Sequence, residues 1–207
     1  DRMSEDYATR FRREARLLSK LTHPGICQVY ELIETPAADY LVMEFVLGQP
    51  LDRYAASATL LGAPDIGLLT MTEMAGWAAR IVDAAELPVF ADGDNGHGNT
   101  SNVRRTMRQF EKAGVAGIFF EDQVSPKRCG HMAGKQVVPA AEMVGKIQAA
   151  VDARVDPDLI VMARTDALAI HGIDNAIERM HRYLEAGADM AFIEAPQSVD
   201  QMRRILS

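Results

Sequence analysis

The sequence predicts an α/β fold: a partial (β/α)₈ TIM-type barrel with about four central βα units, preceded by a helix and a β-hairpin. Three observations support this prediction. Short apolar runs alternate with segments of helical periodicity, polar residues follow the apolar runs, and these polar positions recur about every 30 residues. The helix and hairpin are assigned to residues 1–54, and the barrel region to residues 55–207.

Four apolar runs are expected to form buried parallel strands, because a strand covered on both faces is apolar throughout. They are residues 88–91, 117–120, 159–163 and 190–193. Stretches with helical periodicity predict the intervening helices. These are residues 72–85, 99–113, 139–151 and 173–186. Gly187 follows the last of them, and glycine commonly ends a helix before a strand.

Polar side chains follow each predicted strand at its carboxyl end. They are Asp92 and Asp94, Glu121 and Asp122, Arg164 and Asp166, and Glu194. The interval from Asp92 to Glu121 is 29 residues and that from Arg164 to Glu194 is 30, each the length of one βα unit. The 43 residues from Glu121 to Arg164 leave room for an inserted loop. Because (β/α)₈ barrels carry their chemistry at this end of the strands, the pattern predicts a functional site.

The first of these positions has the sequence Asp92-Gly93-Asp94, which places two carboxylates at one strand end. Hard oxygen ligands of this kind suit Mg²⁺ or Mn²⁺. Acidic pairs are also common in ordinary loops, so the motif alone leaves a metal site and a plain loop as alternatives.

The inserted loop contains a cysteine among basic residues, in the order Lys127-Arg128-Cys129-Gly130-His131. Neighbouring positive charge lowers the pKa of a thiol, which suits it to donate or accept a proton near neutral pH. A surface loop with an incidental cysteine is the alternative.

Five sequence runs extend these observations. They are PDIGLLTMTEM, PVFADGDNGHGN, GVAGIFFEDQVSPKRCGHMAGKQVVP, LIVMARTDA and AGADMAFIEA. In order and spacing they resemble the isocitrate lyase and phosphoenolpyruvate mutase superfamily, over about 150 of the 207 residues. K-R-C-G-H resembles the lyase branch, closest to methylisocitrate lyase, rather than the mutase or oxaloacetate decarboxylase branches.

The resemblance implies a magnesium-dependent carbon–carbon lyase, with Mn²⁺ as the alternative metal. Such an enzyme cleaves a 2-hydroxy di- or tricarboxylate, such as methylisocitrate, to a 2-oxo acid and a dicarboxylate. Asp92 resembles the direct metal ligand, and Asp94 and Glu121 resemble residues that hold the metal through its waters. Asp65, in the P-D-I-G turn, is expected beside them.

Further roles are implied at the matching positions of the loop and the later strands. Cys129 resembles the acid that protonates the departing enolate, and Arg128 and His131 are expected to assist it and, with Gly130, to bind substrate carboxylates. Arg164 resembles the arginine that takes the carboxylate of the 2-oxo or 2-hydroxy acid, and Glu194 a further polar contact with substrate. Closure of the loop over the bound acid would exclude water and bring the thiol within reach.

Residues 10–54 resemble part of the small lobe of a protein kinase, with Glu14 at the position of the ion-pairing glutamate. A glycine-rich phosphate loop, the V-A-I-K lysine, the H-R-D loop and D-F-G are all missing from the sequence. These parts bind ATP and position magnesium in kinases. We therefore expect a structural role for this segment.

The composition indicates which kinds of binding partner and which cellular compartment to expect. The net charge of −7 argues against a nucleic-acid or anionic-membrane surface, which would need clustered lysine and arginine. The two cysteines give no disulfide framework, which favours a reducing cytoplasm. No apolar run approaches the ~18 residues of a membrane-spanning helix. A small carboxylic acid is the expected partner, and the resemblance implies a homo-oligomer because the family forms tetramers.

The sequence leaves the state of the barrel open. A complete barrel of this family has two βα units before the P-D-I-G turn and two more strands after Glu194, so a half barrel would expose strand edges. Either the hairpin or a second copy of the chain would cover these edges, or the sequence is an artificial fusion that does not fold to an active enzyme. A non-catalytic fragment or interaction module, or an enzyme of the phosphoenolpyruvate mutase or oxaloacetate decarboxylase type, therefore competes with the lyase hypothesis.

Overall fold

The computed structural model describes residues 29–34, 39–43, 67–85, 88–128 and 134–205. The chain divides into two compact units, residues 1–49 and 50–205. In the first unit, β1 (Val29–Glu34) and β2 (Asp39–Met43) pair antiparallel, with Leu32 opposite Leu41. The predicted hairpin is confirmed. The expected first helix and Glu14 lie outside the described residues, so the kinase resemblance stays a prediction.

The second unit contains a parallel sheet of four strands whose spatial order follows the chain order. The strands are β3 (Phe90–Asp92), β4 (Gly117–Glu121), β5 (Ile160–Thr165) and β6 (Met190–Ile193). Strand order in a doubly wound open sheet reverses at a switch point, whereas in a (β/α)₈ barrel it does not. The sheet is therefore the arc of a barrel, as the sequence predicts.

All four predicted strands are present, but β3, β4 and β5 continue further at their carboxyl ends than the apolar runs do. Asp92 pairs with Phe119, and Glu121 pairs with Arg164, inside the ladder. The predicted boundaries were wrong here because a polar residue was taken to mark the end of a strand. These polar side chains are instead buried in the sheet.

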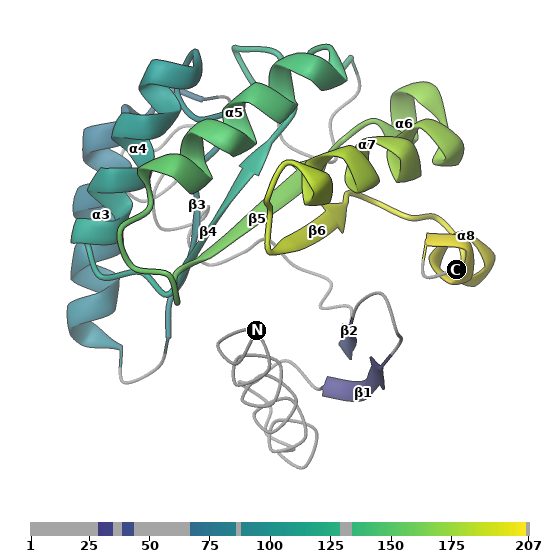
Figure 1. Ribbon diagram of the computed structural model, residues 1–207, viewed down its shortest axis with the longest axis horizontal. Coiled ribbons are helices and arrows are strands. Elements are labelled where there is room, and N and C mark those ends of the chain that lie inside the picture. Colours follow the sequence, from purple (N-terminus) through teal and green to yellow (C-terminus); the bar gives the residue numbers. More distant parts are fainter. Residues whose placement is uncertain (1–28, 35–38, 44–66, 86–87, 129–133, 206–207) are drawn as a thin grey trace. The chain divides into compact units, whose positions relative to one another are not determined.

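Four helices lie along one side of the sheet, each beside the next, as Figure 1 shows. They are α3 (Met71–Ala84), α4 (Thr100–Lys112), α5 (Ala140–Ala153) and α7 (Ile173–Glu185). All four were predicted, whereas the short helices α6 (Leu168–His171) and α8 (Val199–Ile205) were not. Among the described residues, no helix has the length and apolar character needed to cross a membrane.

The core lies between the sheet and this layer of helices. On α4, Val103, Met107 and Phe110 are fully buried, while Arg105 and Arg108 are exposed, as their helical spacing predicts. The facing side chains of β4, α5 and β5 are also fully buried; they include Ile118, Phe120, Met143, Ile147 and Val161. The strands that lead to the polar residues are thus packed against a continuous apolar core.

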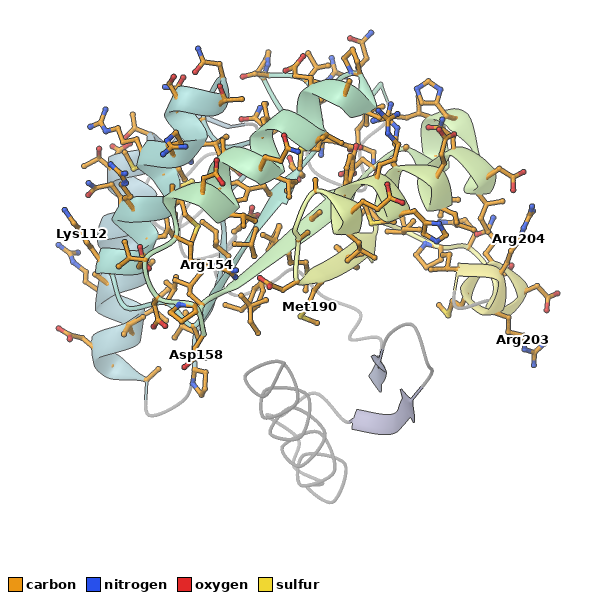
Figure 2. The ribbon with its side chains drawn as sticks, in the orientation of Figure 1. Lys112, Arg154, Asp158, Met190, Arg203 and Arg204 are labelled. Atoms are coloured by element: carbon orange, nitrogen blue, oxygen red, sulfur yellow. The ribbon has the colours of Figure 1, made fainter. Side chains whose placement is uncertain are left out.

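Hydrogen bonds to charged side chains fix the amino ends of β5 and β6. Figure 2 shows Arg154, Asp158 and Met190 near the amino ends of β5 and β6. Arg154 Nη1 donates to Leu159 O at 2.8 Å and to Asp189 Oδ2 at 2.6 Å. The same oxygen of Asp189 accepts the Val161 N–H at 2.8 Å, so one carboxylate ties the turn before β6 to the start of β5.

We expect Asp189→Ala to lower the free energy of unfolding by about 1–3 kcal/mol, because it removes charged hydrogen bonds to partly buried donors. Urea titration followed by circular dichroism measures this change. Asp200→Ala is the control, since Asp200 pairs with Arg203 on the exposed surface of α8 and should contribute little. Equal effects of the two substitutions would contradict the assignment.

The loop between β3 and α4 is held from three directions. The Gly93 N–H donates to Phe119 O, and the Glu121 N–H donates to Asp94 O, each at 2.9 Å, so the loop stays against β4. Lys146 Nζ of α5 donates to Asn95 O at 3.0 Å, and Thr106 Oγ1 of α4 donates to Gly96 O at 3.3 Å. The backbone that carries Asp92 and Asp94 is therefore fixed before any ligand binds.

Gly93 is needed for this close approach. A Cβ at this position would lie 2.8 Å from Phe120 Cε1 and 2.9 Å from Phe119 O, closer than real Cβ contacts. We expect Gly93→Ala to destabilise the protein by about 1–3 kcal/mol, because the loop must move away from β4.

Gly76→Ala is the matched control for Gly93→Ala. Gly76 lies on α3 with nothing within 4 Å of an added Cβ, so alanine should stabilise its helix by about 0.5–1 kcal/mol. Urea unfolding of both variants checks the prediction. A Gly93→Ala protein as stable as the Gly76→Ala protein would show that the loop tolerates displacement.

Candidate active site

Asp92 and Asp94 form one side of a buried polar cluster at the carboxyl end of β3. The Asp94 N–H donates to Asp92 Oδ1 at 2.8 Å, and Asp94 has a left-handed backbone with φ of 49°. Lys127 brings a buried ammonium group to both carboxylates: its Nζ lies 3.9 Å from Asp92 Oδ2 and is in contact with Asp94 Oδ1. Two negative charges are thereby partly compensated inside the protein.

Lys127 was not predicted as a site residue, although it is the first residue of the K-R-C-G-H loop. The available signal was its position, because a lysine in the loop after β4 can reach the neighbouring end of β3. In the sequence its charge was read only as part of the positive field around Cys129. The structure gives it a separate role as the cation that lies against the aspartate pair.

Glu121 and Arg164 form the centre of the cluster and come from paired positions of β4 and β5. Glu121 is fully buried, and its Oε2 lies 3.5 Å from Arg164 Nε. The pKa of the Glu121 carboxyl is raised to about 8, mainly because the group is buried; Arg164 opposes this shift and the charge of Asp92 adds to it. The structure thus brings Asp92, Glu121 and Arg164 together, as the sequence predicts.

Arg164 is oriented chiefly by Asp166. Its Nε donates to Asp166 Oδ2 at 3.0 Å and its Nη2 donates to Asp166 Oδ1 at 3.1 Å, a two-point contact that fixes the plane of the guanidinium. Lys135 Nζ donates to the same carboxylate at 2.7 Å. Burial would raise the pKa of Asp166, but Arg164 and Lys135 outweigh it and hold that pKa below its usual value.

Two residues of β6 and its carboxyl end complete the surroundings of Arg164. Glu194 Oε2 lies 3.5 Å from Arg164 Nη2, and the Phe192 ring centre lies 5.8 Å from Arg164 Cζ. Burial would lower the pKa of Arg164, but Glu121, Asp166 and Glu194 outweigh it, so its pKa is raised. Arg164 is therefore a permanent positive charge with a fixed direction.

The inserted loop is described on both sides of residues 129–133. Gln123 Oε1 accepts the Arg128 N–H and Gln123 Nε2 donates to Arg128 O, each at 3.0 Å, which fixes the backbone next to Cys129. The side chain of Arg128 is exposed. Asp65, Cys129, Gly130 and His131 lie outside the described residues, and their expected roles stay predictions.

A cavity of about 410 Å³ opens beside Asp94 and Lys127. Its lining is rich in hydroxyl and amide groups from α3, α4 and the inserted loop, including Thr70, Thr72, Asn102 and Ser125. Glu121 and Arg164 do not line it, so it lies on the Asp94 side of the cluster. Within the part of the chain that the structure describes, no three acidic, histidine or cysteine side chains converge as a ready-made metal site.

Comparison with known proteins identifies the family. The family model of phosphoenolpyruvate phosphomutase matches residues 54–207. 2,3-Dimethylmalate lyase of Eubacterium barkeri is 60% identical over 152 residues, which cover 73% of this chain and 53% of the relative. 2-Methylisocitrate lyase of Shewanella oneidensis is 51% identical over 142 residues, which cover 69% of this chain and 49% of the relative. The chain thus spans about half the length of these relatives.

Solved structures agree with this result. A crystal structure of 2,3-dimethylmalate lyase superposes with a TM-score of 0.72 at 39% identity and covers 75% of this chain and 52% of that chain. Phosphonopyruvate hydrolase, solved in complex with oxalate and Mg²⁺, superposes with a TM-score of 0.66 at 32% identity, over 75% of this chain and 54% of that chain. This chain belongs to the phosphoenolpyruvate mutase and isocitrate lyase superfamily, whose members include carbon–carbon lyases and mutases with a TIM-barrel fold.

Proposed function

We propose that this chain forms part of a magnesium-dependent lyase that cleaves a 2-hydroxy di- or tricarboxylate to a 2-oxo acid and a second carboxylic acid. The observation that supports this most directly is the buried Arg164, which Asp166 holds in a fixed direction with its Nε 3.5 Å from Glu121 Oε2. A 2-hydroxy acid has a carboxylate that suits the guanidinium and a hydroxyl that suits the acidic side. The proposal concerns the whole protein, since the chain spans about half the length of its relatives.

Arg164 supplies the carboxylate contact in this proposal. Its guanidinium is planar, permanently charged and held by Asp166, so little side-chain entropy is lost when an anion binds. Glu194, 3.5 Å from Arg164 Nη2, limits how the bound acid approaches and favours one orientation. The substrate carboxylate would thereby place the neighbouring hydroxyl-bearing carbon toward Asp92 and Glu121.

Magnesium fits the acidic side of the cluster. Asp92, Asp94 and Glu121 provide hard oxygen ligands. Burial, and to a smaller extent the charge of Asp92, raises the pKa of the Glu121 carboxyl, so a cation bound beside it would favour its ionised form. These residues, with Asp65, would hold the ion directly or through water. A bound Mg²⁺ would lower the energy of the alkoxide form of the substrate hydroxyl. The complex of phosphonopyruvate hydrolase with oxalate and Mg²⁺ supports the same pairing of metal and acid.

The chain's own residues account for the movement of protons and electrons. The substrate hydroxyl gives its proton to a carboxylate of the acidic cluster and becomes a carbonyl, the adjacent carbon–carbon bond breaks, and its electron pair passes to the neighbouring carbon as an enolate. The thiol of Cys129 then donates a proton to that carbon. Gln123 supports this step, because its two hydrogen bonds to the Arg128 backbone fix the chain directly before the cysteine.

Substituted malates and methylisocitrate are the substrates to test first. The higher identity to 2,3-dimethylmalate lyase, 60% against 51% for 2-methylisocitrate lyase, favours the substituted malate. K-R-C-G-H favours a lyase over a mutase, since a proton donor is needed when an enolate leaves as a separate product. Oxaloacetate in the same assay tests the decarboxylase alternative. Phosphonopyruvate tests the mutase alternative when the phosphoenolpyruvate formed is measured separately.

We expect the purified protein to release a 2-oxo acid from 2,3-dimethylmalate or 2-methylisocitrate, to lose this activity in EDTA and to regain it with added Mg²⁺. Cys129→Ser should lower the rate by about 10²-fold or more, because the proton donor is lost. A coupled lactate dehydrogenase assay follows the 2-oxo acid through NADH absorbance. No release from either acid by the cooperatively folded protein, or full activity in EDTA, would overturn the proposal.

Arg164→Lys should raise KM for the 2-hydroxy acid by about 10-fold or more, because a lysine cannot reproduce the two-point contact with Asp166 or the planar donor set. Steady-state kinetics over a range of substrate concentrations measures the effect. Arg203→Lys is the control, since this exposed arginine pairs with Asp200 at the surface of α8. An unchanged KM in the Arg164→Lys protein would remove Arg164 from the carboxylate contact.

A further inference from the structure

Asp122 directly follows Glu121, but its side chain enters the opposite side of the sheet. Glu121 contacts Arg164, whereas Asp122 contacts Arg179 and Tyr183 of α7. Successive residues of a strand point to opposite faces, which explains the division. The pair therefore joins the polar cluster to the helix layer behind it.

We propose that Asp122, held by Arg179, is a positioning residue that sets the direction of Arg164 by fixing the backbone of Thr165 and Asp166. The inference rests on the proposed role of Arg164 in binding a substrate carboxylate. Asp122 does not touch the proposed substrate position; it acts through the next strand.

The carboxylate of Asp122 contacts the end of β5 at two points. Its Oδ1 accepts the Asp166 N–H at 3.0 Å, and its Oδ2 accepts a hydrogen bond from Thr165 Oγ1 at 2.6 Å. Thr165 Oγ1 in turn accepts the Ala167 N–H at 3.1 Å. The backbone that follows Arg164 is thus fixed over three consecutive residues.

Asp122 also holds the strands through its main chain. Its N–H donates to Arg164 O at 3.2 Å, and its carbonyl accepts the Val138 N–H at 2.8 Å. The end of β4, the end of β5 and the segment before α5 are therefore joined at one residue. A shift of any of them would move Arg164 relative to Glu121.

α7 completes the arrangement from the other side. Arg179 Nη1 donates to Asp122 Oδ2 at 3.0 Å and to Val138 O at 2.9 Å, and Arg179 Nε donates to Asn175 Oδ1 at 2.9 Å. Tyr183 Oη donates to Asp122 Oδ2 at 2.9 Å, and burial together with the charge of Asp122 raises the Tyr183 pKa, so the hydroxyl stays a donor. The carboxylate is satisfied by donors in fixed directions.

This directional arrangement distinguishes positioning from simple stabilisation. A buried ion pair adds little net stability, because the cost of removing two charges from water offsets their attraction. Its specific effect is geometric: Asp122 holds the backbone N–H of the residue whose carboxylate reaches Arg164 at 3.0 and 3.1 Å. The oxygen that accepts the Asp166 N–H is therefore the part of Asp122 that matters for Arg164.

Two double variants distinguish the effect of the Asp122 oxygen that accepts the Asp166 N–H from the effect of the Asp122–Arg179 ion pair. Asp122→Asn with Arg179→Met removes both charges but retains an oxygen for the Asp166 N–H. Asp122→Ala with Arg179→Met removes both charges and that oxygen. Both keep the buried site neutral, so loss of an ion pair is common to the two proteins.

We expect the alanine variant to raise KM by about 10-fold, to weaken oxalate binding in the presence of Mg²⁺ by a similar factor, and to speed amide exchange at residues 165–167. The asparagine variant should stay within about threefold of the unmodified protein in KM and oxalate affinity. Kinetics, isothermal calorimetry with oxalate and hydrogen–deuterium exchange measure these effects. Equal behaviour of the two variants, or unchanged amide exchange, would overturn the inference.

A third variant covers the case in which the alanine protein fails to fold. Thr165→Val removes one donor to Asp122 at nearly constant volume and should weaken oxalate binding by about threefold; an unchanged affinity would overturn the inference. If the unmodified protein neither turns over a 2-hydroxy acid nor binds oxalate, the proposed function fails. If it does both and the asparagine and alanine variants match it, the positioning role alone fails.

Discussion

The buried carboxylates at the carboxyl end of the sheet exist because cations from other segments lie against them. Burial of an ionised carboxylate without a partner costs several kcal/mol, roughly the stability of a small domain. Lys127 lies against the aspartate pair, Lys135 against Asp166, and Arg179 against Asp122. The inserted loop and α7 are thus bound to the sheet by charge as well as by packing. Removing Lys127 would also act on Glu121, because the charge of this lysine lowers the pKa of that carboxyl.

The register of the parallel strands determines which charged side chains lie next to one another in the cluster. Glu121 pairs with Arg164 across β4 and β5, so a carboxyl group and a guanidinium lie side by side in neighbouring strands. β3 contributes the aspartate pair on one side and β6 leads to Glu194 on the other. The cluster therefore has a positive group and an acidic side at a fixed separation. In the proposed reaction, that polarity would suit cleavage next to a hydroxyl-bearing carbon.

Much of this arrangement could be predicted from the sequence, because apolar runs identify buried strands and polar residues mark their carboxyl ends. Asp92, Glu121, Arg164 and Glu194 are found where that reasoning places them. Lys135 and Arg179 could not be predicted, since each meets its acid across a long stretch of chain and a single cation has no local pattern. Lys127 was missed although its position in the loop after β4 was a usable signal. The short helices α6 and α8 were missed because four and seven residues are too few to show periodicity. The strand ends were misplaced because burial of a polar side chain depends on partners that only the fold supplies.

The link from Asp122 to α7 has a consequence for how such an enzyme can change. Arg179 and Tyr183 belong to the outer layer of the fold, yet they contact a residue adjacent to Glu121. Small shifts in how this helix packs would reach Arg164 through the hydrogen bonds that Asp122 makes to β5, with every group around Arg164 left chemically intact. Mutations in α7, remote from the reacting atoms, would therefore change substrate preference in this architecture. α7 is accordingly a region to vary in directed evolution.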